Sequence, residues 1–398
     1  MNRGFVNDLK VLDLTQGIAG PFASKLLADQ GAQVIKVEPV EGDYSRRRGP
    51  FASEVPDLES SLTFAFYNTS KKSITLDFRT QTGADLVREM AQRSDIIIED
   101  LRPGEMSSLG LGYDELSALN PSLIVVSVTP FGQTGPYRDF AWEDITLQAI
   151  SGFMYLSGNA DRPPVQAVLE QAQNMGGRCT ANAILLAIME RSLTGEGQHV
   201  DVSISEAVAT EPPMHFTQYN YLGVVSKRSR RINVPTDGDF LPCKDGYICI
   251  ASSGGNTWEE LAILLDAPEL LDDKYATRPS RAQNAIELFD LMVSRLKDRN
   301  KHEVFHAAMQ NHFVFGVAQT PEEVLACPQL ADREYFQEVT HPILGTLRYT
   351  GSGFRVDGEQ CTDVSPAPLL GQHNKEIYCD WLGRSNEALS RLKAAGVI

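Results

Sequence analysis

The chain has 398 residues, of which 42% are hydrophobic and 22% charged, and its formal net charge is -16 at pH 7. This length predicts two to three globular domains with a large buried core. The negative charge argues against nucleic acid as the main partner and against a polybasic membrane contact. An anionic ligand would need a local basic site, because the overall field repels it.

The cysteines make no CxxC pair and no zinc-binding spacing. The six are Cys179, Cys243, Cys249, Cys327, Cys361 and Cys379. Sparse thiols of this kind fit a reducing cytosol, where we expect most of them to be small buried hydrophobes. Residues 1–8 hold no apolar signal core and no run of 18 apolar residues occurs, so we expect a cytoplasmic protein.

In chain order, apolar runs alternate with segments of helical period. The predicted strands are 11–14, 32–38, 73–77, 95–99, 123–128 and 199–203, and the predicted helices are 22–30, 82–92 and 144–192, the last broken at 158–164. This alternation indicates right-handed crossovers and a parallel, doubly wound, Rossmann-like α/β sheet. Ligands of such sheets bind beyond the carboxyl ends of the strands.

A second unit starts near Phe240, after a basic stretch at 227–231. Its first segment, 241–253, is typical of a β-hairpin, and helices are predicted over 257–265 and 281–296. Residues 336–356 are predicted to be β-rich and 375–395 helical. The second unit is therefore expected to be a smaller α+β domain.

Common cofactor and metal motifs are absent: there is no GxGxxG after a strand, no P-loop, no HExxH and no GxSxG. His302 and His306 have the i, i+4 spacing of two metal ligands, with His312 nearby. Because no third ligand completes a motif, we favour a surface helix face and predict no metal site.

Six stretches carry a family resemblance that runs through nearly the whole chain in order. The first is VLDLTQGIAGPFASKLLADQGAQVIKVEP (11–39), and the others are 68–83, 97–137, 193–207, 240–251 and 320–336. They resemble the class III CoA-transferases, which include formyl-CoA and carnitine CoA-transferases.

The resemblance implies both a fold and a reaction. It implies a large α/β domain formed by 1–205 and 331–398, a linker at 206–235, a small domain at 236–330, and two subunits interlocked like linked rings. A carboxylate attacks the acyl-CoA thioester, and CoA then returns to make an enzyme-bound thioester that the acceptor acid takes up. CoA or acyl-CoA is a substrate in this chemistry, and no tightly bound cofactor is expected.

The expected nucleophile is missing. The family aspartate lies at the start of a helix, about ten residues before a segment matched here by 185–188 (LLAI). Counting back from it gives Asn174, and counting forward from Pro163-Pro164 gives Gln173; both are amides, which are poor nucleophiles. We expect no intact catalytic carboxylate, with Glu170 as a fallback, and we expect Asn174 to cap a helix that starts at Met175.

Other positions suggest how CoA is bound. By resemblance, Ile18 and Ala19 in the loop 17–21, together with Leu101 and Arg102, contact CoA. Lys36, Lys71 and Lys72 match basic positions of the family. A solvated strand start at 71–72 and a simple glycine turn at 17–21 are the open alternatives.

Two residues in or near these predicted CoA contacts differ from the family pattern. Asp100 replaces the usual asparagine and would repel an anionic ligand. Ser108 replaces an arginine that serves CoA phosphates in the family. The racemase branch of the family needs a histidine where this chain has Glu143, so proton exchange is not expected.

These observations favour a non-catalytic subunit that associates with a homologous catalytic chain, as an interlocked heterodimer or heterotetramer. Two-subunit members of the family act in anaerobic aromatic degradation, where succinyl-CoA and benzylsuccinate exchange CoA. The alternatives are an active homodimer that uses Glu170 and a CoA-binding scaffold protein without chemistry. No nucleic acid or membrane partner is expected.

Overall fold

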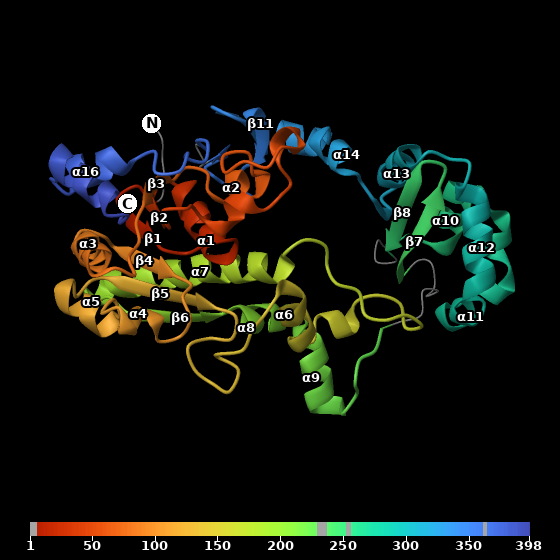
Figure 1. Cartoon of the computed structure of the whole chain (residues 1–398). Coiled ribbons are helices and arrows are strands. Elements are labelled where there is room, and N and C mark those ends of the chain that lie inside the picture. Colours follow the sequence, from red (N-terminus) through yellow and green to blue (C-terminus); the bar gives the residue numbers. More distant parts are fainter. Residues whose placement is uncertain (1–5, 229–236, 252–255, 361–363) are drawn as a thin grey trace. The chain divides into compact units, whose positions relative to one another are not determined.

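A computed structural model describes residues 6–228, 237–251, 256–360 and 364–398. The described residues form two compact units. The larger unit comprises segments within 1–154, 166–223 and 331–398, and the smaller comprises segments within 155–165 and 224–330. Parts from both ends of the sequence therefore build the larger unit, while the middle of the chain builds the smaller one (Figure 1).

The larger unit is organised around one six-stranded sheet in which every strand pair is parallel, as predicted (Figure 1). The strand order is β3-β2-β1-β4-β5-β6. The strands are β1 (Lys10–Asp13), β2 (Gln33–Glu38), β3 (Lys72–Thr75), β4 (Ile96–Glu99), β5 (Ile124–Thr129) and β6 (His199–Ser203). The order reverses between β1 and β4, which makes the carboxyl ends of these two strands the switch point where ligands of such sheets bind.

Alternate strand residues face two different helical layers. Val11 and Ile98 belong to the core beneath one layer, and Leu12 and Ile97 to the core beneath the other. The first layer contains α1 (Ala19–Ala28), α6 (Asp144–Ile150), α7 (Gln171–Thr194) and α8 (Ile204–Ala209). The second contains α3 (Gln81–Ala91), α4 (Glu105–Ser108), α5 (Tyr113–Leu119) and a π-helix (Glu376–Trp381).

Residues from the C-terminal region complete the β3 edge of the sheet. The N–H of Ser73 donates to Nδ1 of His373 over 3.1 Å, and the N–H of Thr75 donates to Oδ1 of Asn374 over 2.9 Å. The buried hydroxyl of Tyr378 donates to the carbonyl of Thr75 over 2.7 Å. Side chains thus satisfy backbone groups that a neighbouring strand would otherwise bind.

The smaller unit is α+β. Its sheet contains β7 (Asp237–Cys243), β8 (Gly246–Ala251) and β9 (Val314–Val317), with α10 (Trp258–Leu265), α12 (Ala285–Leu296) and α13 (Lys301–Gln310) packed around Leu241, Ile248 and Ile250. The predicted helix over 281–296 is two helices, because α11 (Arg278–Gln283) ends at Asn284 and α12 begins after it.

The remaining elements are short. They are α2 (Leu62–Tyr67), α9 (Pro213–Leu222), α14 (Pro321–Leu325), α15 (Pro328–Asp332), β10 (Phe336–His341), β11 (Gly345–Thr350), β12 (Arg355–Val356), β13 (Glu359–Gln360), α16 (Asn386–Ala394) and five short 3-10 turns. Residues 229–235 of the predicted linker, like Cys361, lie outside the described residues. Of the five described cysteines, Cys179 is exposed and the others are partly exposed, which corrects the expectation of buried thiols. No helix among the described residues is long and apolar enough to cross a membrane.

Candidate active site

The loop after β1 lies at the switch point and is joined to the loops after β2 and β4. The N–H of Gly17 donates to Asp43, which follows β2, over 3.1 Å, and the N–H of Gln16 donates to Oδ2 of Asp100, which follows β4, over 2.9 Å. Gly17 has φ +80°, and a Cβ at this position would lie 1.8 Å from the hydroxyl oxygen of Tyr44. Glycine is required here for its backbone conformation and for the close approach of Tyr44.

Ile18 and Ala19 begin α1 directly after this glycine. Ile18 is the N-cap residue, and both side chains are buried. Their main chain, held by the flanking loops, is therefore the part that a ligand at the switch point would meet.

Lys36 lies beneath the loop. Its ammonium pairs with Asp43 over 2.8 Å and donates to the carbonyl of Thr15 over 2.8 Å, and its side chain is fully buried. Burial lowers the pKa of Lys36, but Asp43 and the other nearby carboxylates outweigh this and raise the pKa above its usual value. Lys36 is thus a permanent buried cation that joins the loops after β1 and β2.

Lys71 lies beneath the same loop. Its ammonium pairs with Asp13 over 3.0 Å and donates to the carbonyl of Pro21 over 2.9 Å and to Oδ1 of Asn68 over 2.8 Å. Burial lowers the pKa of Lys71 to about 8, although Asp13 opposes the change. Burial also opposes ionisation of Asp13, but Lys71 and Lys36 hold the pKa of that carboxyl well below its usual range. Lys36 and Lys71 therefore hold the loop from below, and neither ammonium reaches the surface.

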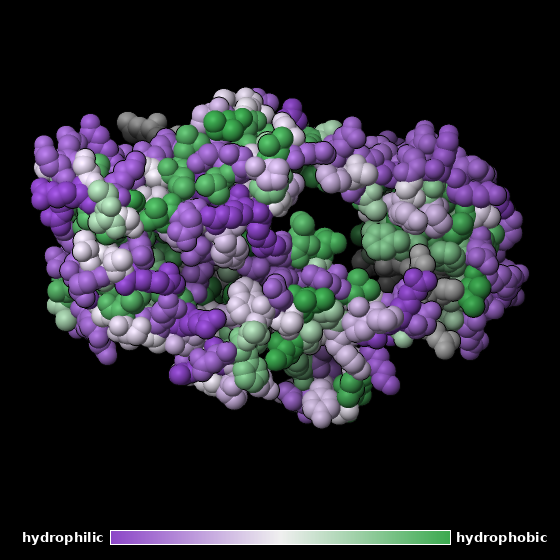
Figure 2. Space-filling view, viewed as in Figure 1, coloured by the Kyte–Doolittle hydropathy of each residue, from purple (hydrophilic) through white to green (hydrophobic). Residues whose placement is uncertain are grey.

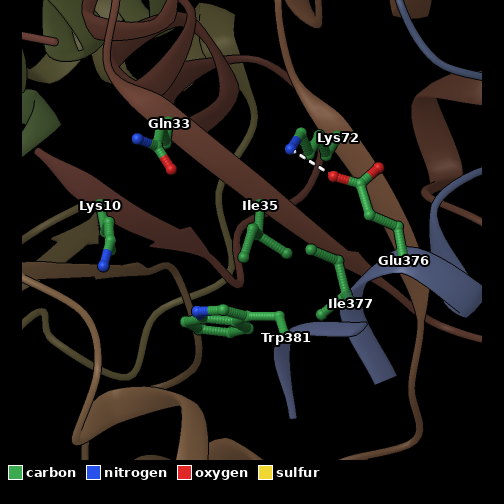
Figure 3. Close-up of a pocket in the computed structure, with 7 residues that line it drawn as sticks. All are labelled: Lys10, Gln33, Ile35, Lys72, Glu376, Ile377 and Trp381. Carbon is green, nitrogen blue, oxygen red and sulfur yellow. Dashed lines mark hydrogen bonds and ion pairs between the residues drawn. The ribbon is translucent and has the colours of Figure 1, made fainter. Parts of the chain in front are cut away.

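Lys72 is the first residue of β3, and Lys71 directly precedes the strand. The two ammonium groups have different partners, Asp13 for Lys71 and Glu376 for Lys72. The Lys72 ammonium pairs with Glu376 over 2.5 Å at the side of a small cavity of about 90 Å³ (Figure 3). The cavity is lined by Lys10, Gln33, Ile35, Lys72, Glu376, Ile377 and Trp381. The three predicted lysines are therefore not gathered at one site.

Two acidic residues lie where β4 ends and its loop begins, Glu99 in the strand and Asp100 in the loop. Glu99 is buried and accepts a hydrogen bond from the N–H of Leu101 over 2.8 Å, and burial raises the pKa of Glu99 to about 7. Burial also raises the pKa of Asp100 well above its usual value, although the hydrogen bond from Gln16 opposes the shift. The predicted repulsion of an anion by Asp100 is weakened accordingly, because the shift favours its neutral form.

The next residues of this loop differ in exposure. Leu101 is buried and Arg102 is exposed, so of these two residues Arg102 is the one that presents its side chain to a ligand. Ser108 lies on α4, where its hydroxyl donates to the carbonyl of Glu105 over 2.7 Å.

The first turn of α7 holds both amides. The helix begins at Gln171 with Glu170 as its N-cap residue, so the prediction that Asn174 caps a helix starting at Met175 is wrong. Asn174 is buried within the first turn: the hydroxyl of Tyr67 donates to its Oδ1 over 2.9 Å, and its Nδ2 donates to the carbonyl of Glu170 over 2.8 Å. Gln173 is also buried, and its N–H donates to Oδ1 of Asp144 over 3.0 Å.

Gly176 and Gly177 serve helix packing. A Cβ at Gly177 would lie 2.7 Å from the carbonyl oxygen of Ala19, and one at Gly176 would lie 2.9 Å from Ile204. These glycines let α7 approach α1 and α8 closely.

Two arginines that the sequence analysis missed lie beside this turn. Nη2 of Arg48 pairs with Oε1 of Glu170 over 2.5 Å, and the guanidinium of Arg178 lies 5.7 Å from the ring centroid of Phe22. Burial raises the pKa of the Tyr67 hydroxyl, and Arg178 and Arg48 both oppose that shift, so both cations act on the same hydroxyl. In the sequence, the run of three arginines at 46–48 is the feature that could have pointed to a cation at this site.

The remaining predicted candidates are elsewhere or have structural partners. Asp144 accepts hydrogen bonds from Gln173 and Gln148 within α6 and α7, and Glu143 forms a capping box with Thr146 at the start of α6. His302 and His306 lie on α13 in the smaller unit, where His302 contacts Glu323. Across the described ranges, no group of three or more His, Cys, Asp or Glu side chains is arranged to hold a metal ion.

Comparison with known proteins assigns this geometry to a family. The sequence model of CoA-transferase family III matches residues 6–374. The chain belongs to CoA-transferase family III. Members of this family use CoA thioesters as substrates and need no tightly bound cofactor.

Several relatives align over nearly their full length. The succinyl-CoA–D-citramalate CoA-transferase of Chloroflexus aurantiacus is 33% identical over 99% of this chain and 98% of its own. The human succinyl-CoA:glutarate CoA-transferase is 31% identical over 98% and 89%. The BbsE subunit of the succinyl-CoA:(R)-benzylsuccinate CoA-transferase of Thauera aromatica is 34% identical over 93% of each chain.

A solved structure shares the fold. A CAIB/BAIF family protein from Brucella suis superposes with a TM-score of 0.84 and 30% sequence identity, covering 94% of this chain and 98% of that one. The predicted family and the predicted α/β fold are thus confirmed.

Proposed function

We propose that this chain is a subunit of a family III CoA-transferase that binds CoA thioesters without supplying the nucleophile, and that a homologous catalytic chain completes the enzyme. The substrates we propose are succinyl-CoA and a second dicarboxylic acid. Three relatives with those acyl groups in their names support this choice, and one of them is named as a subunit.

The observation that carries the proposal is the chemistry of the first turn of α7. Gln173 and Asn174 are both buried amides, and both polar atoms of the Asn174 side chain already have hydrogen-bond partners. An amide oxygen carries no charge to deliver to a thioester carbonyl, whereas covalent CoA transfer needs a carboxylate. The absence of that carboxylate favours a partner role over independent turnover.

In this proposal the loops at the switch point still bind CoA. The main chain at Ile18 and Ala19, with Leu101 and Arg102, lies where a ligand of the sheet is expected. Lys36 and Lys71 then act by holding the loop from below, since each is buried against a carboxylate. Direct contact of Lys72 with CoA is not part of this proposal.

Exposed hydrophobic side chains on the larger unit support a partner chain. Two helices carry exposed hydrophobic side chains, and Figure 2 shows hydrophobic residues over the face that carries α9. They are Leu186, Met189 and Leu193 on α7, and Met214, Phe216, Tyr219, Tyr221 and Leu222 on α9. Exposed apolar areas of this kind mark contacts between chains, and we propose that the homologous chain covers them in an interlocked dimer.

Affinity purification of this chain from its native cell, followed by mass spectrometry, tests the proposal. We expect a second family III chain of similar length with an aspartate aligned to Gln173 or Asn174. We expect the isolated chain to turn over succinyl-CoA at least about 10³-fold more slowly than the complex, since loss of a nucleophile has effects of this size. Full turnover by the isolated chain would contradict the proposal, and CoA binding without any partner would favour a scaffold protein.

A second candidate is an active enzyme that uses Glu170. Its side chain is 29% exposed and its main-chain carbonyl accepts from Nδ2 of Asn174, but its carboxylate is paired with Arg48 and would have to leave that arginine to attack a thioester. Incubation with succinyl-CoA and hydroxylamine, followed by peptide mapping, tests it. A modified Glu170, absent in Glu170→Gln, would establish this candidate, and an unmodified Glu170 would eliminate it.

Two substitutions test directly whether the missing carboxylate belongs at position 173 or 174. Gln173→Asp and Asn174→Asp each restore a carboxylate to the first turn of α7. We expect one of them to form a hydroxylamine-sensitive acyl-enzyme in the isolated chain, and the position that does so identifies the lost nucleophile. If both form none while CoA still binds, the loss of catalysis involves more of the site than this turn.

A further inference from the structure

We propose that Arg48 binds the distal carboxylate of a dicarboxylic acyl group, and that Glu170 occupies this position on Arg48 when no substrate is bound. The proposal rests on the function proposed above and adds the residue that selects dicarboxylic over monocarboxylic acids. It concerns binding and includes no covalent step.

The first argument is position. Arg48 reaches the first turn of α7 through its 2.5 Å contact with Glu170, whose carbonyl accepts hydrogen bonds from the main chain and the side chain of Asn174. The hydroxyl of Tyr44, which lies against Gly17, is close enough for the charge of Arg48 to act on it. Burial, Asp100 and Asp43 raise the pKa of the Tyr44 hydroxyl, and the positive charge of Arg48 opposes that shift. Arg48 therefore pairs with the N-cap residue of the turn that holds Gln173 and Asn174, and its charge acts on the tyrosine that lies against the loop 17–21.

The second argument is availability. The Arg48 side chain is 41% exposed and that of Glu170 is 29% exposed. An ion pair this exposed is weak, because water solvates both charges well. A carboxylate of a ligand can replace Glu170 on Arg48, since it offers the same two oxygens to the guanidinium.

The third argument compares Arg48 with the buried cations of the site. Lys36 and Lys71 are buried and bound to carboxylates of the fold, and Arg46 is buried between Glu38 and Glu59. Their partners are fixed parts of the loops. The partner of Arg48 is an N-cap side chain that makes no capping hydrogen bond, so α7 does not need the Glu170 carboxylate where it lies.

The chemistry selects a carboxylate rather than an uncharged acyl end. The protein carries a net charge of -16, so a second negative charge on the substrate is unfavourable unless a cation meets it. Arginine suits this task because its planar fork binds both oxygens of a carboxylate. A monocarboxylic acid of the same length, with its one carboxylate at the reacting end, has no second carboxylate to exchange for Glu170 on Arg48.

The test compares succinate with butyrate, which has the same number of carbon atoms but one carboxylate, by calorimetric titration of the full chain saturated with CoA. In Arg48→Met, we expect succinate affinity to fall about 10-fold or more, as for a lost hydrogen bond to a charged group, and butyrate affinity to stay within about twofold. In Glu170→Gln, succinate should bind several-fold more tightly because the competing carboxylate is gone. In Arg48→Lys, succinate affinity should lie between those of wild type and Arg48→Met.

Arg47→Met is the matched control, because Arg47 is the adjacent exposed arginine and donates only to the carbonyl of Glu41. It should leave both affinities unchanged. Equal loss of succinate and butyrate in Arg48→Met, no loss of either, or weaker succinate binding in Glu170→Gln would overturn the proposal. So would a wild-type chain that binds CoA but does not prefer succinate. A chain that fails to bind CoA would instead contradict the proposed function.

Discussion

The hydroxyl of Tyr67 donates a hydrogen bond to Oδ1 of Asn174, while Nδ2 of the same amide donates to the main-chain carbonyl of Glu170. This pair of bonds uses the amide as both acceptor and donor. An ionised carboxylate at position 174 would keep the bond from Tyr67 but would face the Glu170 carbonyl without a hydrogen to donate. The neighbours of Asn174 are therefore arranged for an amide.

We predict that Asn174→Asp lowers the free energy of unfolding by about 1–3 kcal/mol at pH 7.5, because the Glu170 carbonyl loses its donor. At pH 5 the loss should be smaller. A protonated carboxyl can donate again, so the folded pKa is raised and stability is lost as the pH rises towards that pKa. Urea unfolding at both pH values measures this. Equal losses at both would contradict the role of the Nδ2 donor.

Gly17 is predicted to tolerate no side chain. Gly17→Ala should lower stability and CoA affinity together, because the new Cβ meets the Tyr44 hydroxyl and the backbone stays at positive φ. Gly195→Ala is the control, since Gly195 has φ +78° with nothing within 4 Å of a Cβ. We expect Gly195→Ala to cost about 1 kcal/mol and to leave CoA affinity unchanged. If the two variants behave alike, the contact with Tyr44 has no effect of its own.

Glu99 should make the protein less stable as the pH rises. Its folded pKa is about 7 because of burial, above the value of 4.5 for an exposed glutamate. The folded state then binds more protons than the unfolded state between these pH values, so stability falls as the pH rises from about 4.5 to 7. Glu99→Gln keeps an acceptor for Leu101 and should be more stable than wild type by about 2–3 kcal/mol at pH 8, and by much less at pH 4.5. Urea unfolding across this range, compared with the wild type, would show a constant difference if Glu99 did not titrate there.

The pair of Asp13 and Lys71 is predicted to be strongly coupled. Asp13→Asn leaves a buried ammonium without its carboxylate and should lower the free energy of unfolding by about 3–5 kcal/mol. The double variant Asp13→Asn, Lys71→Met removes both charges and should be more stable than Asp13→Asn alone. A double-mutant cycle by urea unfolding measures the coupling. Additive effects of the two substitutions would show that the ion pair is not what holds the loop.

The sheet could be predicted from the sequence because its strands are fully buried. Runs such as 96–98 and 124–126 are continuously apolar, and helices of regular length separate them. The exact ends of the helices were harder to predict from the sequence. Asn174 is a strong N-cap residue by type, yet α7 begins at Gln171, four residues before the predicted start, and the Asn174 amide bonds instead to Tyr67, 107 positions away.

The site could be predicted only in part. A lysine is usually exposed, so the sequence predicted that Lys36 and Lys71 contact a ligand. In the structure both are buried, because Lys36 pairs with Asp43 and Lys71 pairs with Asp13. Arg48 was missed because its partner Glu170 lies 122 positions away, and nothing local in the run of arginines distinguishes it from Arg47. The domain ranges and the roles of the predicted contacts stay predictions.

The β3 edge has a consequence for the synthesis of the protein. The side chains that bind the backbone of Ser73 and Thr75 follow them by about 300 positions in the chain. A growing polypeptide that has already emerged with all six strands still lacks these partners, and its β3 edge stays open to other chains. The larger unit therefore completes its fold only late in translation, after the whole smaller unit has been made, and chaperone binding to nascent chains should persist until residues 364–398 leave the ribosome.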